Sequence, residues 1–245
     1  MTTTQSTFKS ELVKAFKNNS LSSLVNNDRA TAFEKLTFFM LEENEKYNLT
    51  AITDLDKIIL NHYLDCAALA ARLPKDAKIC DIGCGAGFPT LPIAILRPDV
   101  KITAIDSTAK RVNYVKCAAD MLGLTNVECV VMRAEDGGNN ELYREKYDVA
   151  TARAVAALPI LAELCVPYVR CGGQFIAMKG KNAEYEIKDA RRALSILGIT
   201  DLKCEEITLT GSEETLTHPL VIMKKGAKTP KNYPRPYAQI SKKPL

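Results

Sequence analysis

The stretch Ile79-Cys80-Asp81-Ile82-Gly83-Cys84-Gly85-Ala86-Gly87-Phe88 decides the fold of this chain of 245 residues. A short β-branched run ends at an acid, passes through a glycine-rich turn and enters a helix. Glycine tolerates positive φ and lets a ligand approach the backbone, and helix N-termini attract anionic groups. A second acid, Asp106, ends the next predicted strand, where doubly wound folds place a carboxylate on a ribose. The pattern therefore predicts a site for a cofactor that contains a nucleoside.

The spacing of the glycines indicates which cofactor this is. A dinucleotide-binding turn reads G-x-G-x-x-G/A and needs a small sixth residue, which here is Phe88. Together with Asp81, the three glycines instead form D-x-G-x-G-x-G, the pattern of the first strand of S-adenosylmethionine (SAM) methyltransferases. SAM is therefore the expected cofactor, and the alternatives are a dinucleotide or a turn that binds nothing.

Strand-like and helix-like segments alternate from residue 78 onward. Helices are expected from Ser107 to near Gly123 and from Asn182 to just before Gly198, with ordinary capping residues at those ends. Such alternation predicts a parallel sheet covered on both faces. No helix fits between the last two strands, so they should form an antiparallel hairpin. The expected strands are Lys78–Ile82, Lys101–Ile105, Val127–Met132, Asp148–Ala152, Gln174–Met178, Cys204–Leu209 and Leu220–Met223.

Three regions are expected along the chain. Residues 1–73 show helical periodicity and form an N-terminal helical extension. Residues 74–225 form the SAM-binding methyltransferase domain, and residues 226–245 a basic, proline-rich tail. The predicted fold is α/β, a Rossmann-like class I SAM-dependent methyltransferase with seven mostly parallel strands and a terminal antiparallel hairpin.

Composition excludes several classes of protein. No apolar stretch of about 20 residues is free of charges, so no membrane span is expected. The start of the chain lacks the apolar core of a secretion signal. The eight cysteines contain no C-x-x-C pair and there are two histidines, so no metal site is predicted. We expect a cytoplasmic monomer with reduced cysteines.

Positive charge gathers at the C-terminal end. Seven of the 33 basic residues and none of the 29 acidic ones follow residue 223, so the remainder holds 26 and 29. Cations neutralise phosphates and aromatic rings stack on exposed bases. Lys231 and Arg235, which lie among prolines and tyrosines, are therefore expected to contact RNA. The alternatives are a disordered tail and a segment packed along the sheet.

Ligands of open parallel sheets lie beyond the carboxyl ends of the strands. That rule selects Arg133 to Asp136 after the third strand as a contact for the adenine edge, or as solvated charges. Arg153 lies in an apolar run, where an unpaired guanidinium would be unfavourable. Its partner is either a structural carboxylate or the ligand, and we favour the site. Lys179 either contacts the substrate or extends from its strand end into water.

Two residues of the N-terminal extension are also candidates for the site. Asn48 is a plausible loop contact of the substrate. His62 and Asp65 share one helix face, which favours a joint between the helical extension and the sheet over catalysis.

The absence of two methyltransferase motifs restricts which atom can accept the methyl group. Enzymes that methylate exocyclic amines usually carry an Asn/Asp-Pro-Pro-aromatic turn after the fourth strand, where this chain has Thr151-Ala152-Arg153-Ala154. Enzymes that methylate pyrimidine carbon need a nucleophilic cysteine, typically after a proline, and none of the eight follows one. A ring nitrogen with a free lone pair, such as N7 of guanine, needs neither. Catalysis would then be mostly positioning.

Several separate motifs resemble the ribosomal RNA small-subunit methyltransferase G family, from about residue 30 to the C-terminus. They are Asn48-Leu49-Thr50, His62-Tyr63-Leu64-Asp65, Asp81 to Pro89, Asp106-Ser107, Lys110-Arg111, Arg133-Ala134-Glu135, Ala152-Arg153-Ala154-Val155-Ala156, Lys179-Gly180, and the closing Thr229-Pro230, Tyr233-Pro234-Arg235 and Lys243-Pro244-Leu245. Thr90 replaces a glycine common after the Phe-Pro, and Cys66 and Cys84 stand where serine or threonine is frequent.

The resemblance implies SAM-dependent methylation of N7 of one guanine in 16S ribosomal RNA, as naked RNA or in the small-subunit particle. It also implies cofactor contacts at Gly83, Phe88, Ala134, Glu135 and Arg153, to which the residues themselves add Gly85 and Asp106. Expected substrate contacts are Asn48, His62, Lys179, Lys231 and Arg235, and no catalytic residue is assigned. The alternatives are a small-molecule SAM methyltransferase and a SAM-binding RNA scaffold without turnover.

Overall fold

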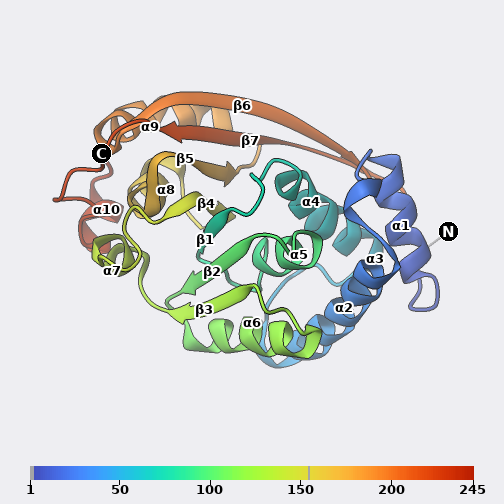
Figure 1. Cartoon of the computed structure of the whole chain (residues 1–245). Coiled ribbons are helices and arrows are strands. Elements are labelled where there is room, and N and C mark those ends of the chain that lie inside the picture. Colours follow the sequence, from blue (N-terminus) through green and yellow to red (C-terminus); the bar gives the residue numbers. More distant parts are fainter. Residues whose placement is uncertain (1–2, 154) are drawn as a thin grey trace.

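Seven strands form one sheet in the order β3-β2-β1-β4-β5-β7-β6 in the computed structural model, which describes residues 3–153 and 155–245 (Figure 1). The strands β1 to β5 run parallel, and β7 is antiparallel to both β5 and β6. The strand order reverses between β1 and β4, which is where such sheets open a ligand crevice. The strands are β1 (Lys78–Ile82), β2 (Lys101–Asp106), β3 (Val127–Val131), β4 (Tyr147–Arg153), β5 (Val169–Met178), β6 (Ile199–Thr210) and β7 (Thr215–Lys225).

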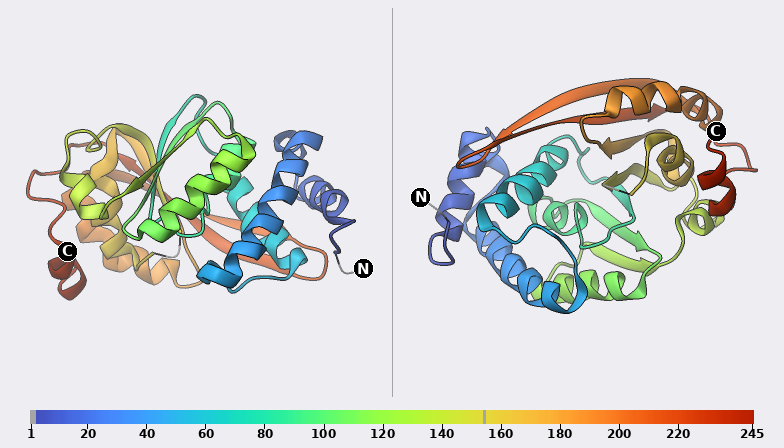
Figure 2. Two further views of the ribbon diagram at one scale, coloured as in Figure 1. Left: turned by 90° about the horizontal axis from the view of Figure 1, so that it is seen from below. Right: turned by 180° about the vertical axis from the view of Figure 1, so that it is seen from behind.

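Helices cover both faces of the sheet (Figure 2). Alternate strand residues point to opposite faces, so Ile79 belongs to one hydrophobic cluster and Cys80 to the other. The first cluster includes α1, α2, α4, α5 and α6, and the second includes α8, α9 and α10. The helices are α1 (Phe8–Asn18), α2 (Asn27–Tyr47), α3 (Leu55–Ile58), α4 (Asp65–Ala70), α5 (Thr90–Leu96), α6 (Ala109–Leu122), α7 (Ala134–Asn139), α8 (Leu158–Cys165), α9 (Ala183–Leu197) and α10 (Tyr237–Lys242), with short turns η1 (Ser22–Leu24), η2 (Ile59–Leu64) and η3 (Val166–Tyr168).

The predicted α/β fold is confirmed, including the terminal antiparallel hairpin. Helices α6 and α9 end where expected, because Gly123 and Gly198 adopt the left-handed conformation that closes a helix. Strands β6 and β7 are longer than predicted. Their added residues are mostly polar and exposed, so they carry little of the apolar signal by which a strand is recognised.

The N-terminal helices pack on the same hydrophobic cluster as β1 and β2, with Phe8, Phe33 and Leu69 fully buried. The β6–β7 hairpin extends along the sheet until its tip reaches α1 (Figure 1). There the Asn19 side chain donates to the Thr210 carbonyl and accepts from the Thr210 N–H, both at 2.8 Å. The division into residues 1–73, 74–225 and 226–245 stays a prediction.

Candidate active site

A crevice of about 560 Å³ opens at the carboxyl ends of β1 to β4. Its size lies within the range of small-molecule sites, about 300–1,000 Å³. The walls come from the loop after α2, the glycine turn, the ends of β2 to β4, and the helices α6, α7, α8 and α10. The lining residues are Leu49, Ile82, Gly83, Gly85, Ala86, Ile105, Asp106, Ser107, Thr108, Arg111, Met132, Arg133, Ala134, Glu135, Arg153, Val155, Leu164 and Tyr237.

The glycine turn has the backbone that its sequence requires. Gly83 and Gly85 have φ of +74° and +51°, a region that other residues rarely adopt. The Gly83 N–H donates to the Ile105 carbonyl at 2.8 Å, which fixes the turn against β2. A Cβ on Gly85 would meet nothing nearer than the Gly83 carbonyl, 3.8 Å away. Gly85 therefore leaves space in the crevice that a side chain would fill.

Asp106 stands opposite this turn at the end of β2. Its Oδ2 accepts from the Gly85 N–H at 3.1 Å and its Oδ1 accepts from the Thr108 N–H at 2.8 Å. A carboxylate offers about four acceptor positions, so two remain for the hydroxyls of a ribose. The Arg111 guanidinium lies 3.9 Å away. Asp106 is thus held rigidly with acceptor capacity left over.

Asp81 lies behind the turn and is fully buried. Its Oδ2 accepts from the Thr90 hydroxyl at 2.5 Å, whereas its Oδ1 has no partner among the described residues. Burial raises the pKa of Asp81 to about 6, against the lowering effects of the Thr90 hydrogen bond and of Arg153. Thr90, which departs from the family pattern, is therefore the hydrogen-bond partner of the motif's first acid.

Arg153, at the end of β4, connects the crevice to the N-terminal extension. Its Nη1 donates to the Asn61 carbonyl at 3.0 Å and lies 3.3 Å from Asp65 Oδ2. Its Nη2 donates to His62 Nδ1 at 3.2 Å, and the guanidinium lies over the Phe88 ring at 5.0 Å. The partner required by the apolar surroundings of Arg153 is thus a structural carboxylate, although Arg153 also lines the crevice.

His62 supports this arginine from the side. Its ring stacks on Phe88 with 4.2 Å between centroids, and its Nε2 lies 3.2 Å from the Thr50 hydroxyl. Burial and the positive charge of Arg153 lower the pKa of His62 to about 4. The histidine is therefore neutral at physiological pH and accepts from Arg153.

A second cavity, of about 280 Å³, shares Arg153 with the crevice. There Asp65 Oδ1 lies 2.7 Å from Nε2 of His218, on β7. Burial disfavours the charged His218, but the close carboxylate of Asp65 outweighs it, so the pKa of His218 is raised. Lys179 also lines this cavity, paired with Glu186 at 2.6 Å. The other lining residues are Asn61, Met178, Gly180 and Leu216.

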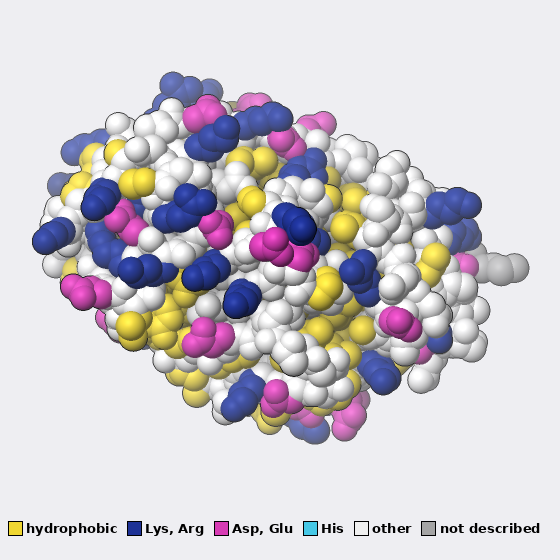
Figure 3. All heavy atoms as spheres, viewed as in Figure 1, with side chains coloured by type: hydrophobic (Ala, Val, Ile, Leu, Met, Phe, Trp, Pro, Cys, Tyr) yellow, Lys and Arg dark blue, Asp and Glu magenta, His cyan; other side chains and the backbone are white. Residues whose placement is uncertain are grey.

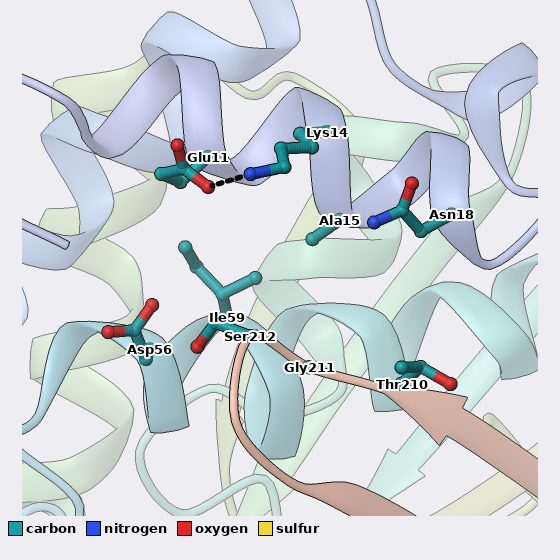
Figure 4. A pocket seen from close by; sticks show the side chains of 9 residues that line it. All are labelled: Glu11, Lys14, Ala15, Asn18, Asp56, Ile59, Thr210, Gly211 and Ser212. Atoms are coloured by element: carbon teal, nitrogen blue, oxygen red, sulfur yellow. Dashed lines mark hydrogen bonds and ion pairs between the residues drawn. The ribbon is translucent and has the colours of Figure 1, made fainter. Parts of the chain in front are cut away.

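A third cavity, of about 300 Å³, lies between α1 and the tip of the β6–β7 hairpin (Figure 4). Its charged side chains include the Glu11–Lys14 pair at 3.3 Å, whose lysine is two-thirds exposed. None of the strand ends that carry the glycine turn, Asp106 or Arg153 contributes to it. It is therefore separate from the crevice.

The crevice brings together six of the seven predicted cofactor contacts, Gly83, Gly85, Asp106, Ala134, Glu135 and Arg153. The seventh, Phe88, is buried behind Arg153. Of the predicted substrate contacts, Asn48 is exposed beside Leu49 at the crevice, His62 is buried, and Lys179 lines the second cavity. Lys231 is exposed on the tail, and Arg235 pairs with Glu163.

Tyr237, His218 and the apolar walls Leu49, Val155 and Leu164 were not predicted to line these cavities. His218 was detectable as one of two histidines, whereas Tyr237 stood out only as an aromatic residue of the basic tail. Ala154, inside the motif after β4, lies outside the described residues.

Within the part of the chain that the structure describes, no helix has the length and apolarity of a membrane span, and no three potential ligands gather into a metal site.

The sheet order, the glycine turn and the carboxylate after β2 define a class I SAM-dependent methyltransferase. The fold is similar to that of a SAM-dependent O-methyltransferase from Thermotoga maritima, with TM-score 0.54 and 14% identity, over 77% of this chain and 72% of that one.

The family model for rRNA small subunit methyltransferase G matches residues 29–215, and the chain belongs to this family. It is 47% identical to ribosomal RNA small subunit methyltransferase G of Lactobacillus acidophilus, over 86% of this chain and 89% of that protein. It is 43% identical to the protein of the same name from Clostridium perfringens, over 90% and 92%. SAM is accordingly the cofactor, and the crevice has the volume and the acceptors that fit it.

Proposed function

We propose that this chain methylates N7 of one guanine in 16S ribosomal RNA. When bound, SAM supplies a sulfonium-activated methyl group, which a ring nitrogen with a free lone pair accepts without a base. The observation that carries the proposal is the cavity beside the crevice, because the two share Arg153. An acceptor base there would lie next to the cofactor.

The residues around both cavities favour an unassisted acceptor. No cysteine lines either of them among the described residues. Burial raises the pKa of Cys66 and Cys84, so both remain thiols and neither is an activated nucleophile. The turn that accepts the hydrogens of an exocyclic amine is absent from the sequence after β4. Positioning is then the main contribution of the protein.

The proposed cofactor contacts divide the crevice. The part of SAM that lies against the protein backbone would contact Gly83 and Gly85 of the glycine turn. Asp106 would hold the ribose of SAM. Ala134 and Glu135 would meet the adenine edge. Phe88 and His62 would act through Arg153, whose guanidinium both of them contact.

Surface charge supports an RNA substrate over a small metabolite. Lys110, Arg111 and Arg133 are exposed around the crevice, and cations of this kind bind phosphates. On the face of the molecule drawn in Figure 3, Lys and Arg side chains are denser over the half that carries the C-terminal segment than over the half formed by the N-terminal helices. We propose the cytoplasm as the location, where ribosomal RNA is found, and a monomer as the active form. Asn48, Lys179, Lys231 and Arg235 stay proposed RNA contacts.

Methyl-labelled SAM, incubated with unmethylated 16S RNA or with small subunits, tests the proposal. Transfer to RNA, followed by borohydride reduction and aniline scission at one guanine, supports N7 chemistry. Label that appears only in metabolites would favour a small-molecule enzyme, and cofactor binding without transfer would favour an RNA scaffold.

Arg153→Ala gives a second test. It removes a crevice wall and the partner of Asp65, so SAM binding measured by calorimetry should weaken by about tenfold or more. His218→Gln is the comparison, since His218 lines the second cavity and does not line the crevice. It should leave SAM affinity unchanged and raise the KM for RNA. Unchanged SAM affinity in Arg153→Ala would contradict the role given to Arg153.

A further inference from the structure

The C-terminal segment reaches the cofactor crevice. Tyr237, at the start of α10, lines it together with Met132, Ala134 and Glu135 from the end of β3 and from α7. These partners lie about a hundred residues earlier in the sequence. The Tyr237 side chain is 41% exposed, so a large aromatic surface remains uncovered there.

A buried ion pair anchors this segment to α8. Glu163 is fully buried and receives three hydrogen bonds from Arg235, from its backbone N–H at 2.9 Å, its Nε at 2.8 Å and its Nη2 at 2.6 Å. Leu164, the next residue of α8, lines the crevice. A bidentate pair of this kind fixes position and angle together, so Arg235 sets where Tyr237 lies.

Arg144 fixes the segment to α7. Its Nη1 donates to the Gly138 carbonyl at 2.8 Å and to the Tyr233 carbonyl at 2.7 Å. Its Nη2 donates to the Thr229 carbonyl at 2.8 Å and to the Pro230 carbonyl at 3.1 Å. One guanidinium thus joins the crevice wall to the tail through four backbone carbonyls.

Helix α7 contains two glycines, of which Gly137 makes room for Tyr168 and Met132 and Gly138 makes room for the C-terminal segment. Glycine in a helix costs about 1 kcal/mol relative to alanine, so a pair of them needs a packing reason. A Cβ on Gly138 would lie 2.8 Å from Pro234 Cγ and 3.3 Å from Pro167 Cβ. The Asn139 side chain also donates to the Pro234 carbonyl at 3.0 Å. The glycine at 138 therefore allows the tail to lie against the helix that forms the adenine-side wall.

We propose that residues 229–242 are a wall of the cofactor site and that Tyr237 contacts the adenine end of SAM. The segment is then fixed against the crevice by the ion pair of Arg235 with Glu163, while Lys231 stays exposed to solvent. Docking of the tail and occupancy of the crevice are linked, so each stabilises the other.

Calorimetry of SAM binding to the full chain is the direct test. Tyr237→Ala should weaken binding by about tenfold, the scale of aromatic contacts with bases, while Tyr237→Phe should keep most of the affinity. Tyr185→Ala is the matched control, because Tyr185 is 72% exposed on α9 and does not line the crevice. An affinity in Tyr237→Ala equal to that of the unchanged chain would overturn the proposal. A raised KM for RNA with unchanged SAM affinity would instead identify an RNA arm.

Gly138→Ala tests the coupling without touching the crevice lining. Alanine favours the helix but displaces Pro234, so SAM affinity should fall several-fold while the unfolding temperature stays near that of the unchanged chain. Hydrogen exchange gives the converse measurement. SAM should slow exchange of the amides of residues 237–242, and this protection should be lost in Tyr237→Ala. If SAM did not change the hydrogen-exchange rate of this segment, the linkage between tail docking and SAM binding would be refuted.

Discussion

Asp81 and His62 both bind protons differently in the folded and unfolded chain, and their effects on stability have opposite signs. Burial raises the pKa of Asp81 from 3.8 to about 6, and burial together with Arg153 lowers the pKa of His62 from 6.5 to about 4. In the unchanged chain the two effects on the free energy of unfolding oppose each other. Replacing Asp81 should therefore reveal the pH dependence caused by His62, and replacing His62 should reveal that caused by Asp81.

The sign follows from which state holds the proton more tightly. Asp81 holds its proton more tightly in the folded chain than in the unfolded chain. Its contribution to the free energy of unfolding is therefore present below pH 3.8 and is lost as the pH rises to about 6. Folded His62 holds it less tightly, so its contribution is present above pH 6.5 and is lost as the pH falls to about 4. Each shift of two or more pKa units corresponds to about 3 kcal/mol, so the two effects nearly cancel.

Other titrating groups act outside this window. Hydrogen bonds or ion pairs lower the pKa of several carboxylates, so their contributions are lost only in more acidic solution. Those carboxylates are Asp56, Asp99, Glu145, Asp148 and Glu205. The pKa of His218 is raised, so its contribution is lost above pH 6.5. The interval from about pH 4.5 to 6.5 therefore isolates Asp81 and His62.

Urea unfolding across this interval measures the effect. Asp81→Asn keeps an acceptor for Thr90 but cannot titrate, so its unfolding free energy should rise by about 2–3 kcal/mol from pH 4.5 to 6.5. His62→Gln should show a fall of similar size, and the unchanged chain less than about 1 kcal/mol of change. Asp81→Asn and unchanged profiles that run parallel would refute the reasoning, because Asp81 would then have no raised pKa.

Two further pairs of substitutions test the glycine turn and Lys225, a buried lysine at the end of β7. Gly87→Ala places a Cβ 2.5 Å from Leu91 in a residue with φ of +83°. It should lower the free energy of unfolding, measured by thermal denaturation, by about 2–4 kcal/mol. Gly123→Ala, at φ +67° with nothing within 4 Å, should lose only about 1–2 kcal/mol, and equal losses would contradict the packing argument. Lys225→Met leaves Glu145 without its 2.9 Å partner and should lose about 3 kcal/mol in chemical unfolding. Adding Glu145→Gln should recover part of that loss, and no recovery would argue against the ion pair.

Features encoded in adjacent residues could be predicted from the sequence. The bounds of β1 match the prediction, because an apolar run ends abruptly at the glycine turn. Asp106 lies opposite Gly85 as expected, since parallel strands end at the same edge of a sheet. The end of α9 at Gly198 follows from the conformational freedom of glycine.

Features that depend on distant residues could not be predicted. The sequence indicated that His62 and Asp65 join the helical extension to the sheet, but no local pattern identified their partner Arg153, which lies 88 positions after Asp65. The helical periodicity of residues 1–73 correctly predicted helices there but not the π-helical turn η2 among them. Tyr237 lines the crevice from a segment that Arg235 anchors to Glu163, a contact between residues 72 positions apart.

The pairing of Asn19 with Thr210 has a consequence for synthesis of the chain. The two residues are 191 positions apart, so helix α1 leaves the ribosome long before the hairpin tip that it contacts. Closing a loop of that length costs about 5 kcal/mol of chain entropy unless intervening structure has already formed. This contact therefore forms after the sheet, as one of the last steps of folding.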